Sequence, residues 1–149
     1  NSLAYPFAFQ PAPPGFVIPQ KQTKINWVVP NNIPLPANLN ELSFYSIPQL
    51  ASLIKNKKIS SEALTRFFIG RLKKWGDTLE CVITITEELA LKEAAQADEE
   101  IKRGNYRGPL HGIPYGLKDL FAVKGYKTTW GSVPYKDQVL DEDAFVYTQ

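Results

Sequence analysis

Lys118 is the side chain of this sequence whose surroundings point most directly to chemistry. It lies inside GIPYGLKDLFAV, an apolar and strand-like run at residues 112–123. Apolar surroundings withdraw solvation from a charged ammonium and so favour the neutral amine. A neutral lysine amine can act as a general base. The run therefore predicts a catalytic lysine, provided that its side chain is kept dry.

The neighbours of Lys118 support this interpretation. Side chains of a strand alternate between its two faces, which places Lys118 with Gly116 and Leu120 and puts Asp119 on the other face. Gly116 leaves open space beside the lysine. We expect Asp119 to point away from the amine and to hydrogen-bond backbone groups of neighbouring loops.

Two other interpretations of Lys118 remain open at this point. Lysines are rarely buried unless paired, so Lys118 can be a structural ion-pair partner in a non-catalytic α/β binding module. It can also form a Schiff base with pyridoxal phosphate, which predicts absorbance beyond the protein band that borohydride quenches. An alanine at position 118 that left amide turnover unchanged would favour the structural role.

The other chemistry-bearing residues are few. His111 is the single histidine, so the sequence holds no histidine cluster for a metal, and a Ser-His-Asp triad could be built only around it. We expect His111 to be a turn residue. Cys81 is the single cysteine and stands in the β-branched run at 81–85, which predicts a small buried side chain in a strand. The residues imply no cofactor and no metal.

Composition excludes several classes of partner. The net charge is +2 and the hydrophobic fraction is 44%, so a nucleic acid or an anionic membrane is not expected as the main partner. The basic runs at 55–58 and 71–74 are expected to be solvated helix faces. No apolar run approaches the roughly 18 residues of a membrane helix. The glycines around residue 112 lead into a predicted strand, whereas phosphate-binding loops lead out of one into a helix.

Residues 1–40 form a first segment of distinct composition. Eight of the 12 prolines lie there, which favours an extended, irregular arm because proline has no backbone donor and is excluded from helix interiors. The arm also holds Tyr5, Phe7, Phe9, Phe16, Val17, Ile18, Trp27, Val28 and Val29. We therefore expect it to lie along a larger body, pinned by these aromatic and aliphatic side chains.

Residues 41–149 alternate between helix and strand patterns. Ser46 predicts the start of a helix, because Ser46 and Gln49 have the capping-box spacing. Ser60 or Ser61 caps a second helix, which Gly76 ends as a C′ residue, a position that commonly has left-handed geometry. The apolar stripe of that helix, expected to pack in the core, is Leu64, Phe67, Phe68, Leu72 and Trp75.

A third helix is predicted from about residue 87 to residue 103. Its buried side is Leu89, Leu91, Ala94, Ala97 and Ile101. Asp98 with Lys102, and Glu99 with Arg103, have the i,i+4 spacing of helical ion pairs. Gly104 stops this helix, and Asp141 or Asp143 caps a further helix that starts at Ala144. With strands at 81–85 and 112–123, the order of elements predicts an α/β fold.

From Gly108 to Ser132 the sequence resembles the amidase signature family. The resemblance rests on a Gly-Ile-Pro-x-x-x-Lys-Asp string, on the Gly-Pro-Leu-His before it, and on the glycine, Thr-Thr and Gly-Ser that follow at 125–132. The order of the helices and the Asp-Ala-Phe-Val at 143–146 also fit the family. Residues 1–40 lie outside the resemblance.

The resemblance implies a fold and a mechanism. The fold would be the N-terminal part of a large mixed β-sheet covered by helices on both faces. Lys118 would be the base of a Ser–cis-Ser–Lys triad that hydrolyses the C–N bond of a small-molecule carboxylic amide. Both serines belong to downstream loops, so the remainder of the same protein is the expected partner and this chain alone is expected to be inactive. Ser132 is assigned a turn role.

Within the family, the alternative is a glutamine-dependent transamidase subunit, which feeds ammonia to charged transfer RNA through the same lysine. The arm at 1–40 and Trp130 favour the plain amidase. Companion subunits in a pull-down would favour the transamidase. The start at Asn1 rather than methionine, with the apolar arm, favours an exported protein, and a cytoplasmic protein is the alternative.

Overall fold

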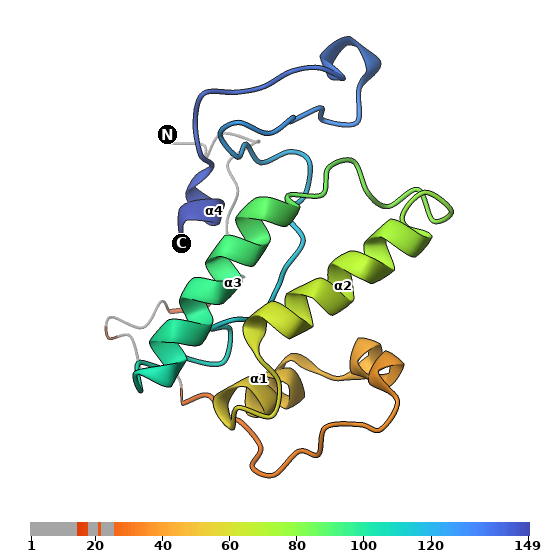
Figure 1. Cartoon of the computed structure of the whole chain (residues 1–149). Helices are drawn as coiled ribbons and strands as arrows, with labels where there is room; N and C mark the ends of the chain where they lie inside the picture. Colours follow the sequence, from red (N-terminus) through yellow and green to blue (C-terminus); the bar gives the residue numbers. More distant parts are fainter. Residues whose placement is uncertain (1–14, 18–20, 22–25) are drawn as a thin grey trace.

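A computed structural model of the chain describes residues 15–17, 21 and 26–149 (Figure 1). Its helical elements, in chain order, are η1 (Leu39–Phe44), α1 (Ile47–Lys55), α2 (Ser61–Trp75), α3 (Glu87–Lys102), η2 (Val133–Tyr135) and α4 (Phe145–Thr148). Within these residues there is no β-strand. One isolated antiparallel bridge, between Lys127 and Val139, is the nearest approach to sheet pairing there. No helix in the described part of the chain is long and apolar enough to cross a membrane.

Helices α1 and α2 begin at the serines that the sequence indicated. The Ser46 backbone N–H donates to Gln49 Oε1 at 2.8 Å, and Pro48 occupies the first turn of α1. Ser60 Oγ accepts from the Ala63 backbone N–H at 3.0 Å. Each bond satisfies a backbone donor at a helix start, where no intrahelical partner exists.

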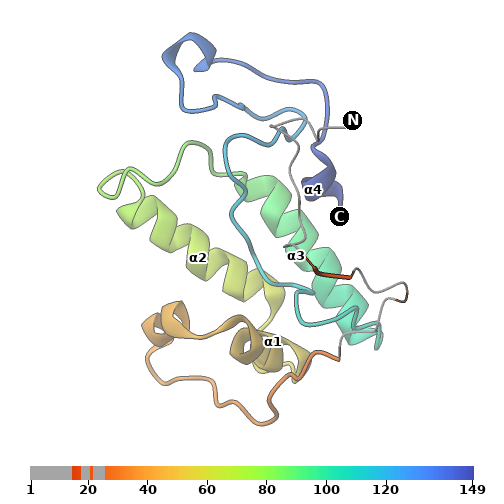
Figure 2. The same cartoon turned by 180° about the vertical axis from the view of Figure 1, so that it is seen from behind.

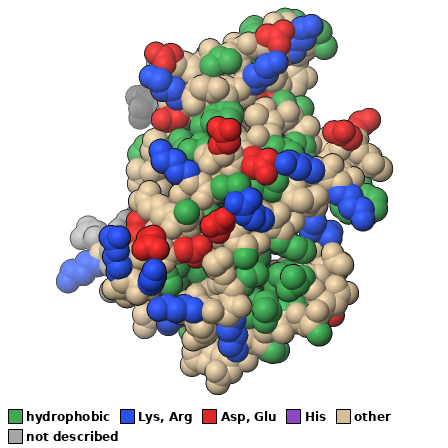
Figure 3. All heavy atoms as spheres, viewed as in Figure 1, with side chains coloured by type: hydrophobic (Ala, Val, Ile, Leu, Met, Phe, Trp, Pro, Cys, Tyr) green, Lys and Arg blue, Asp and Glu red, His purple; other side chains and the backbone are tan. Residues whose placement is uncertain are grey.

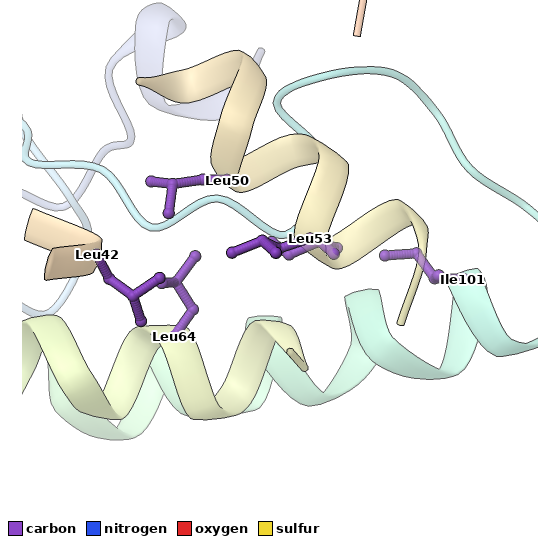
Figure 4. Close-up of a cluster of buried hydrophobic side chains, with 6 residues drawn as sticks. Leu42, Leu50, Leu53, Leu64 and Ile101 are labelled. Carbon is purple, nitrogen blue, oxygen red and sulfur yellow. The ribbon is translucent and has the colours of Figure 1, made fainter. Parts of the chain in front are cut away.

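The core lies where α1 crosses the α2–α3 pair. Helices α2 and α3 lie side by side in both views, and α1 covers their lower ends (Figures 1 and 2). The buried side chains that meet there are Leu42, Leu50, Leu53, Ile54, Leu64 and Ile101 (Figure 4). Element η1, which we did not predict, contributes the fully buried Leu42. Ala94, Ala97 and Ile101 form the buried side of α3 as predicted, while Leu89 and Leu91 are only half-buried.

Asp98 joins α3 to α2 and does not form the ion pair predicted with Lys102. Its two carboxylate oxygens accept from the backbone N–H groups of Ser61 at 2.7 Å and Glu62 at 3.0 Å. These donors stand at the positive end of the α2 dipole, where a carboxylate is stabilised. The predicted pair between Glu99 and Arg103 is present at 3.9 Å.

The C-terminal end of α2 departs from the prediction in two ways. Gly76 follows the helix in right-handed geometry, with φ of −58°, and not as a left-handed residue. A side chain there would come within 2.9 Å of Val82 Cγ2, so close packing explains this glycine. Leu72 and Trp75 remain exposed, so only the first half of the predicted apolar stripe packs in the core. Gly104 ends α3 as predicted, with φ of +88°.

The two predicted strands, at 81–85 and 112–123, are wrong for the described residues. Both segments are irregular or extended chain, and Cys81 is exposed and not buried. A strand exists only when a neighbouring strand accepts and donates its ladder of hydrogen bonds. No such neighbour lies beside either segment in the described part of the chain. The mixed sheet of the expected α/β fold is therefore not confirmed.

The described part of the arm is held by a backbone carbonyl and an aliphatic side chain of Ile33, and not by its aromatic side chains. Lys58 Nζ donates to the Ile33 carbonyl at 2.7 Å, and Ile33 packs against the core. Trp27 and Val28, which we expected to pin the arm, are exposed. Tyr5, Phe7, Phe9 and Ile18 lie outside the described residues. The division of the chain at residue 40 stays a prediction.

Candidate active site

The segment that carries Lys118 starts from a fixed point on α2. Ser61 Oγ donates to the Gly112 carbonyl at 2.7 Å. Gly112 has φ of +81°, and a Cβ there would lie 3.0 Å from Ser61 Cβ. Beyond this point the chain runs along the α2–α3 pair toward residue 118 (Figure 2). The glycine therefore allows both the turn and the close approach that direct the segment along the helices.

Lys118 is exposed, in contrast to the dry setting that we predicted. No carboxylate of the described residues lies within ion-pair distance of its amine. Its carbonyl accepts from the Phe121 backbone N–H at 3.0 Å, so the extended segment ends in a turn at this residue. The burial expected for Lys118 is wrong for the described residues, and its role as a base stays a prediction.

Asp119 performs the role that the sequence analysis expected. Its Oδ1 accepts from the Thr129 backbone N–H at 2.8 Å, and its Oδ2 accepts from the Thr129 hydroxyl. Its carbonyl accepts from the Trp130 backbone N–H at 3.1 Å. Hydrogen bonds to a charged acceptor are among the stronger ones in proteins. Asp119 thus joins the lysine turn to the Thr-Thr segment, and Thr128 and Thr129 are both buried.

Further bonds arrange the loop that follows. The Ala144 backbone N–H donates to the Ala122 carbonyl at 2.9 Å, and the Lys124 backbone N–H donates to Asp143 Oδ1 at 2.8 Å. Asp143 therefore binds the loop and does not cap α4, which begins one residue later than predicted. Ser132 lies in a turn as expected, since its backbone N–H donates to the Thr129 carbonyl at 3.0 Å.

His111 occupies a buried polar cluster before the lysine segment. Its side chain is 1% exposed, its Nδ1 accepts from the Arg107 backbone N–H at 3.1 Å, and its Nε2 lies 3.2 Å from Glu100 Oε2. Burial and the charge of Arg107 lower the pKa of His111, while the carboxylate of Glu100 opposes this shift. His111 is a turn residue as predicted, because its backbone N–H donates to the Gly108 carbonyl at 3.0 Å and its imidazole accepts from the Arg107 backbone.

Sequence reasoning missed Glu100 and Thr129 as partners in these clusters. Glu100 Oε2 also lies 3.1 Å from Arg107 Nε, so one carboxylate faces both a cation and the imidazole. No local sequence pattern relates Glu100 to His111. The two residues meet because the chain turns back between them. Among the described residues, no group of three or more His, Cys, Asp and Glu could hold a metal ion.

Comparison with known sequences identifies the family. The sequence model of the Amidase family matches residues 63–149, a range that contains Lys118, Asp119 and Thr129. The chain belongs to this family. The match begins inside α2, so it includes the helix pair as well as the signature segment.

Its curated relatives include several proteins named as one of the subunits of glutamyl-tRNA(Gln) amidotransferase. That of Methylobacillus flagellatus is 38% identical over 100 residues, which are 67% of this chain and 20% of the relative. That of Nitrosomonas europaea is 43% identical over 101 residues, which are 68% of this chain and 21% of the relative. The chain thus spans about a fifth of the length of these relatives.

Proposed function

We propose that this chain belongs to an enzyme that cleaves the C–N bond of a carboxamide through an acyl-enzyme, with Lys118 as the base. The observation that carries the proposal is the signature segment around Lys118, inside the region that matches the Amidase family. The bond between Asp119 and Thr129 supports it, because it fixes the turn from which Lys118 projects.

In the proposed reaction, neutral Lys118 takes a proton from a serine held by a cis peptide. That serine relays the proton from a second serine, which attacks the amide carbon. Lys118 returns the proton through the same serine to the leaving nitrogen as the C–N bond breaks, so ammonia or an amine leaves and the acyl group stays on the nucleophilic serine. Water then attacks the acyl-enzyme and releases the carboxylic acid. Backbone N–H groups stabilise the oxyanion. In this proposal both serines, and the sheet that would cover Lys118, come from outside the 149 residues.

Between the two family activities, we infer that the glutamine-dependent transamidase is the better supported. The relatives from both bacteria are named as subunits of glutamyl-tRNA(Gln) amidotransferase. By analogy, glutamine would be the amide, and companion subunits would carry the released ammonia to charged transfer RNA. The plain amidase remains the second candidate, on the ground of Trp130 and the proline-rich arm.

The test uses the full protein with and without the companion subunits of a relative. Ammonia release from glutamine is measured first, followed by conversion of glutamyl-tRNA to glutaminyl-tRNA. Amide cleavage together with tRNA conversion in the presence of the companion subunits supports the transamidase. Cleavage of simple carboxamides without tRNA conversion supports the plain amidase, and absence of any amide cleavage contradicts both.

A further inference from the structure

A groove between η1 and the C-terminal half of α2 lies apart from the Lys118 segment. Its volume is about 410 Å³, and it is lined by Asn40, Phe67, Gly70, Arg71, Lys74 and Trp75. Figure 3 shows this face of the molecule, where hydrophobic side chains gather between α2 and η1. We propose that this groove binds a segment of a partner protein that presents a carboxylate beside an apolar side chain.

The charge of the groove selects an anionic partner. Arg71 and Lys74 line it, and neither forms an ion pair with a carboxylate among the described residues. Most other cations of α2 and α3 are paired, as Arg66 is with Glu62 and Lys73 with Glu87. A second cavity of about 330 Å³ differs in this respect, because acidic and basic side chains both line it. Complementary charge is what steers and orients a partner segment.

The walls of the groove are aromatic and hold the two cations in place. Arg71 Cζ lies 5.9 Å from the ring centroid of Phe67, and Lys74 Nζ lies 4.8 Å from that of Trp75. Contact with a ring face restrains each cation and replaces part of its water shell. The cations are therefore positioned to meet a carboxylate, while the exposed part of the Trp75 side chain offers apolar contact. Tryptophan and arginine are among the residues most enriched at the centres of protein interfaces.

Gly70 lines the groove with open space beside it, and we call this part of the groove its floor. It is an interior residue of α2, where glycine weakens a helix relative to alanine. A Cβ added at this position would meet nothing within 4 Å, so packing within the described residues does not require the glycine. The absence of a side chain keeps the floor open, which is the feature that a binding groove needs.

A protein segment fits the groove better than a nucleic acid or the arm of this chain. Two cations are too few for the run of phosphate contacts on which nucleic-acid binding depends. Residues 1–40 contain no aspartate or glutamate, so the arm offers no carboxylate to the two cations.

The test measures peptide binding to the full protein. A fluorescent peptide Leu-Asp-Phe-Glu-Leu is compared with Leu-Asn-Phe-Gln-Leu and with a short oligouridylate by anisotropy. We expect the acidic peptide to bind at least about tenfold more tightly than its amide counterpart, because it makes at least one charge-assisted hydrogen bond. Equal binding of the two peptides, no binding, or preference for the oligouridylate would each overturn the proposal.

Two variants place the binding in the groove. Gly70→Leu fills the floor without changing any charge and is expected to abolish the preference for the acidic peptide. R71Q with K74Q is expected to do the same, while K92Q with K136Q, which removes two exposed lysines elsewhere, retains the preference. Circular dichroism confirms that each variant is folded. Retention of the preference in Gly70→Leu, or its loss in the control pair, contradicts the assignment to this groove.

Discussion

Asp119 holds Thr129 through both oxygens of its carboxylate, one on the backbone N–H at 2.8 Å and the other on the hydroxyl. The two residues are ten positions apart in the chain, and both belong to the segment that resembles the amidase signature family. The bond closes the loop between the lysine turn and the buried Thr-Thr pair. The residue after Lys118 is therefore anchored, although Lys118 itself is exposed.

Removal of this anchor should destabilise the fold. Asp119→Ala leaves the buried donors of Thr129 without an acceptor, so we expect the free energy of unfolding to fall by about 1.5–3 kcal/mol. Urea unfolding of the full protein measures the loss. Asp137→Ala, which breaks an exposed pair with Lys127, is the control and should cost about 0–1 kcal/mol. Equal losses in the two variants would contradict the anchoring role of Asp119.

Gly112 and Gly125 provide a matched test of close packing. Both have left-handed φ angles, +81° and +85°, but only Gly112 faces a neighbour, Ser61, at 3.0 Å. Alanine at either position should cost about 1–2 kcal/mol of backbone strain. Gly112→Ala should cost more than Gly125→Ala, because its Cβ also crowds Ser61 and disturbs the bond to the Gly112 carbonyl. Thermal unfolding decides the order, and equal costs would refute the close contact.

Asp98 is expected to matter as a helix cap and not as an ion-pair partner. Asp98→Ala removes the acceptor for the first two N–H groups of α2, at a cost of about 0.5–2 kcal/mol. Lys102→Ala should change stability by less than about 0.5 kcal/mol. Hydrogen exchange at Ser61 and Glu62 should accelerate in the first variant only. Similar losses in both variants would favour the Asp98–Lys102 pair instead.

The lowered pKa of His111 predicts how the free energy of unfolding depends on pH. Because burial lowers its pKa in the folded state, the unfolded chain binds more protons below the ordinary value of about 6.5. Stability should therefore fall as the pH drops from 7.5 to 5.5, by at most about 1.36 kcal/mol per pH unit for this one group. The other charged and titratable groups around His111 are Glu100, Arg107 and Tyr106.

The His111→Gln variant removes the only histidine and should flatten this pH dependence. The range stays above the window of Glu100, whose pKa is lowered by its bond from Gln96 and by Arg107, so that its stabilising effect is lost only below about pH 4.5. A stability that rose as the pH dropped would mean that the charge of Glu100 outweighs the burial of His111.

The sequence predicted the features of this fold that depend on local chemistry. Ser46, Ser60 and Gly104 bound their helices because capping joins a side chain or a glycine to backbone a few residues away. Strands at 81–85 and 112–123 failed, because a strand requires a partner that the described residues do not supply. The prediction that Lys118 is buried rested on the second of these strands, so it was wrong for the same reason.

Hydrogen-bond partners that are far apart in the sequence were not predicted, for a different reason. Asp98 was matched with a lysine four residues away, but the N–H groups at the start of α2 are 36 and 37 residues distant and hold it instead. The sequence correctly predicted that Asp119 binds a neighbouring loop. It did not predict that the partner in this loop is Thr129. The residue type predicts that a carboxylate accepts hydrogen bonds, whereas the tertiary packing determines which donors lie within reach.

The most direct test of the account is ammonia release from a carboxamide by the full protein carrying Lys118→Ala. If Lys118 is the base, kcat should fall by about 10²–10⁴-fold. Lys136→Ala, at an exposed lysine in the same region, should leave kcat unchanged. An Lys118→Ala protein that is folded and cleaves the amide at the unaltered rate would contradict the proposed role of Lys118.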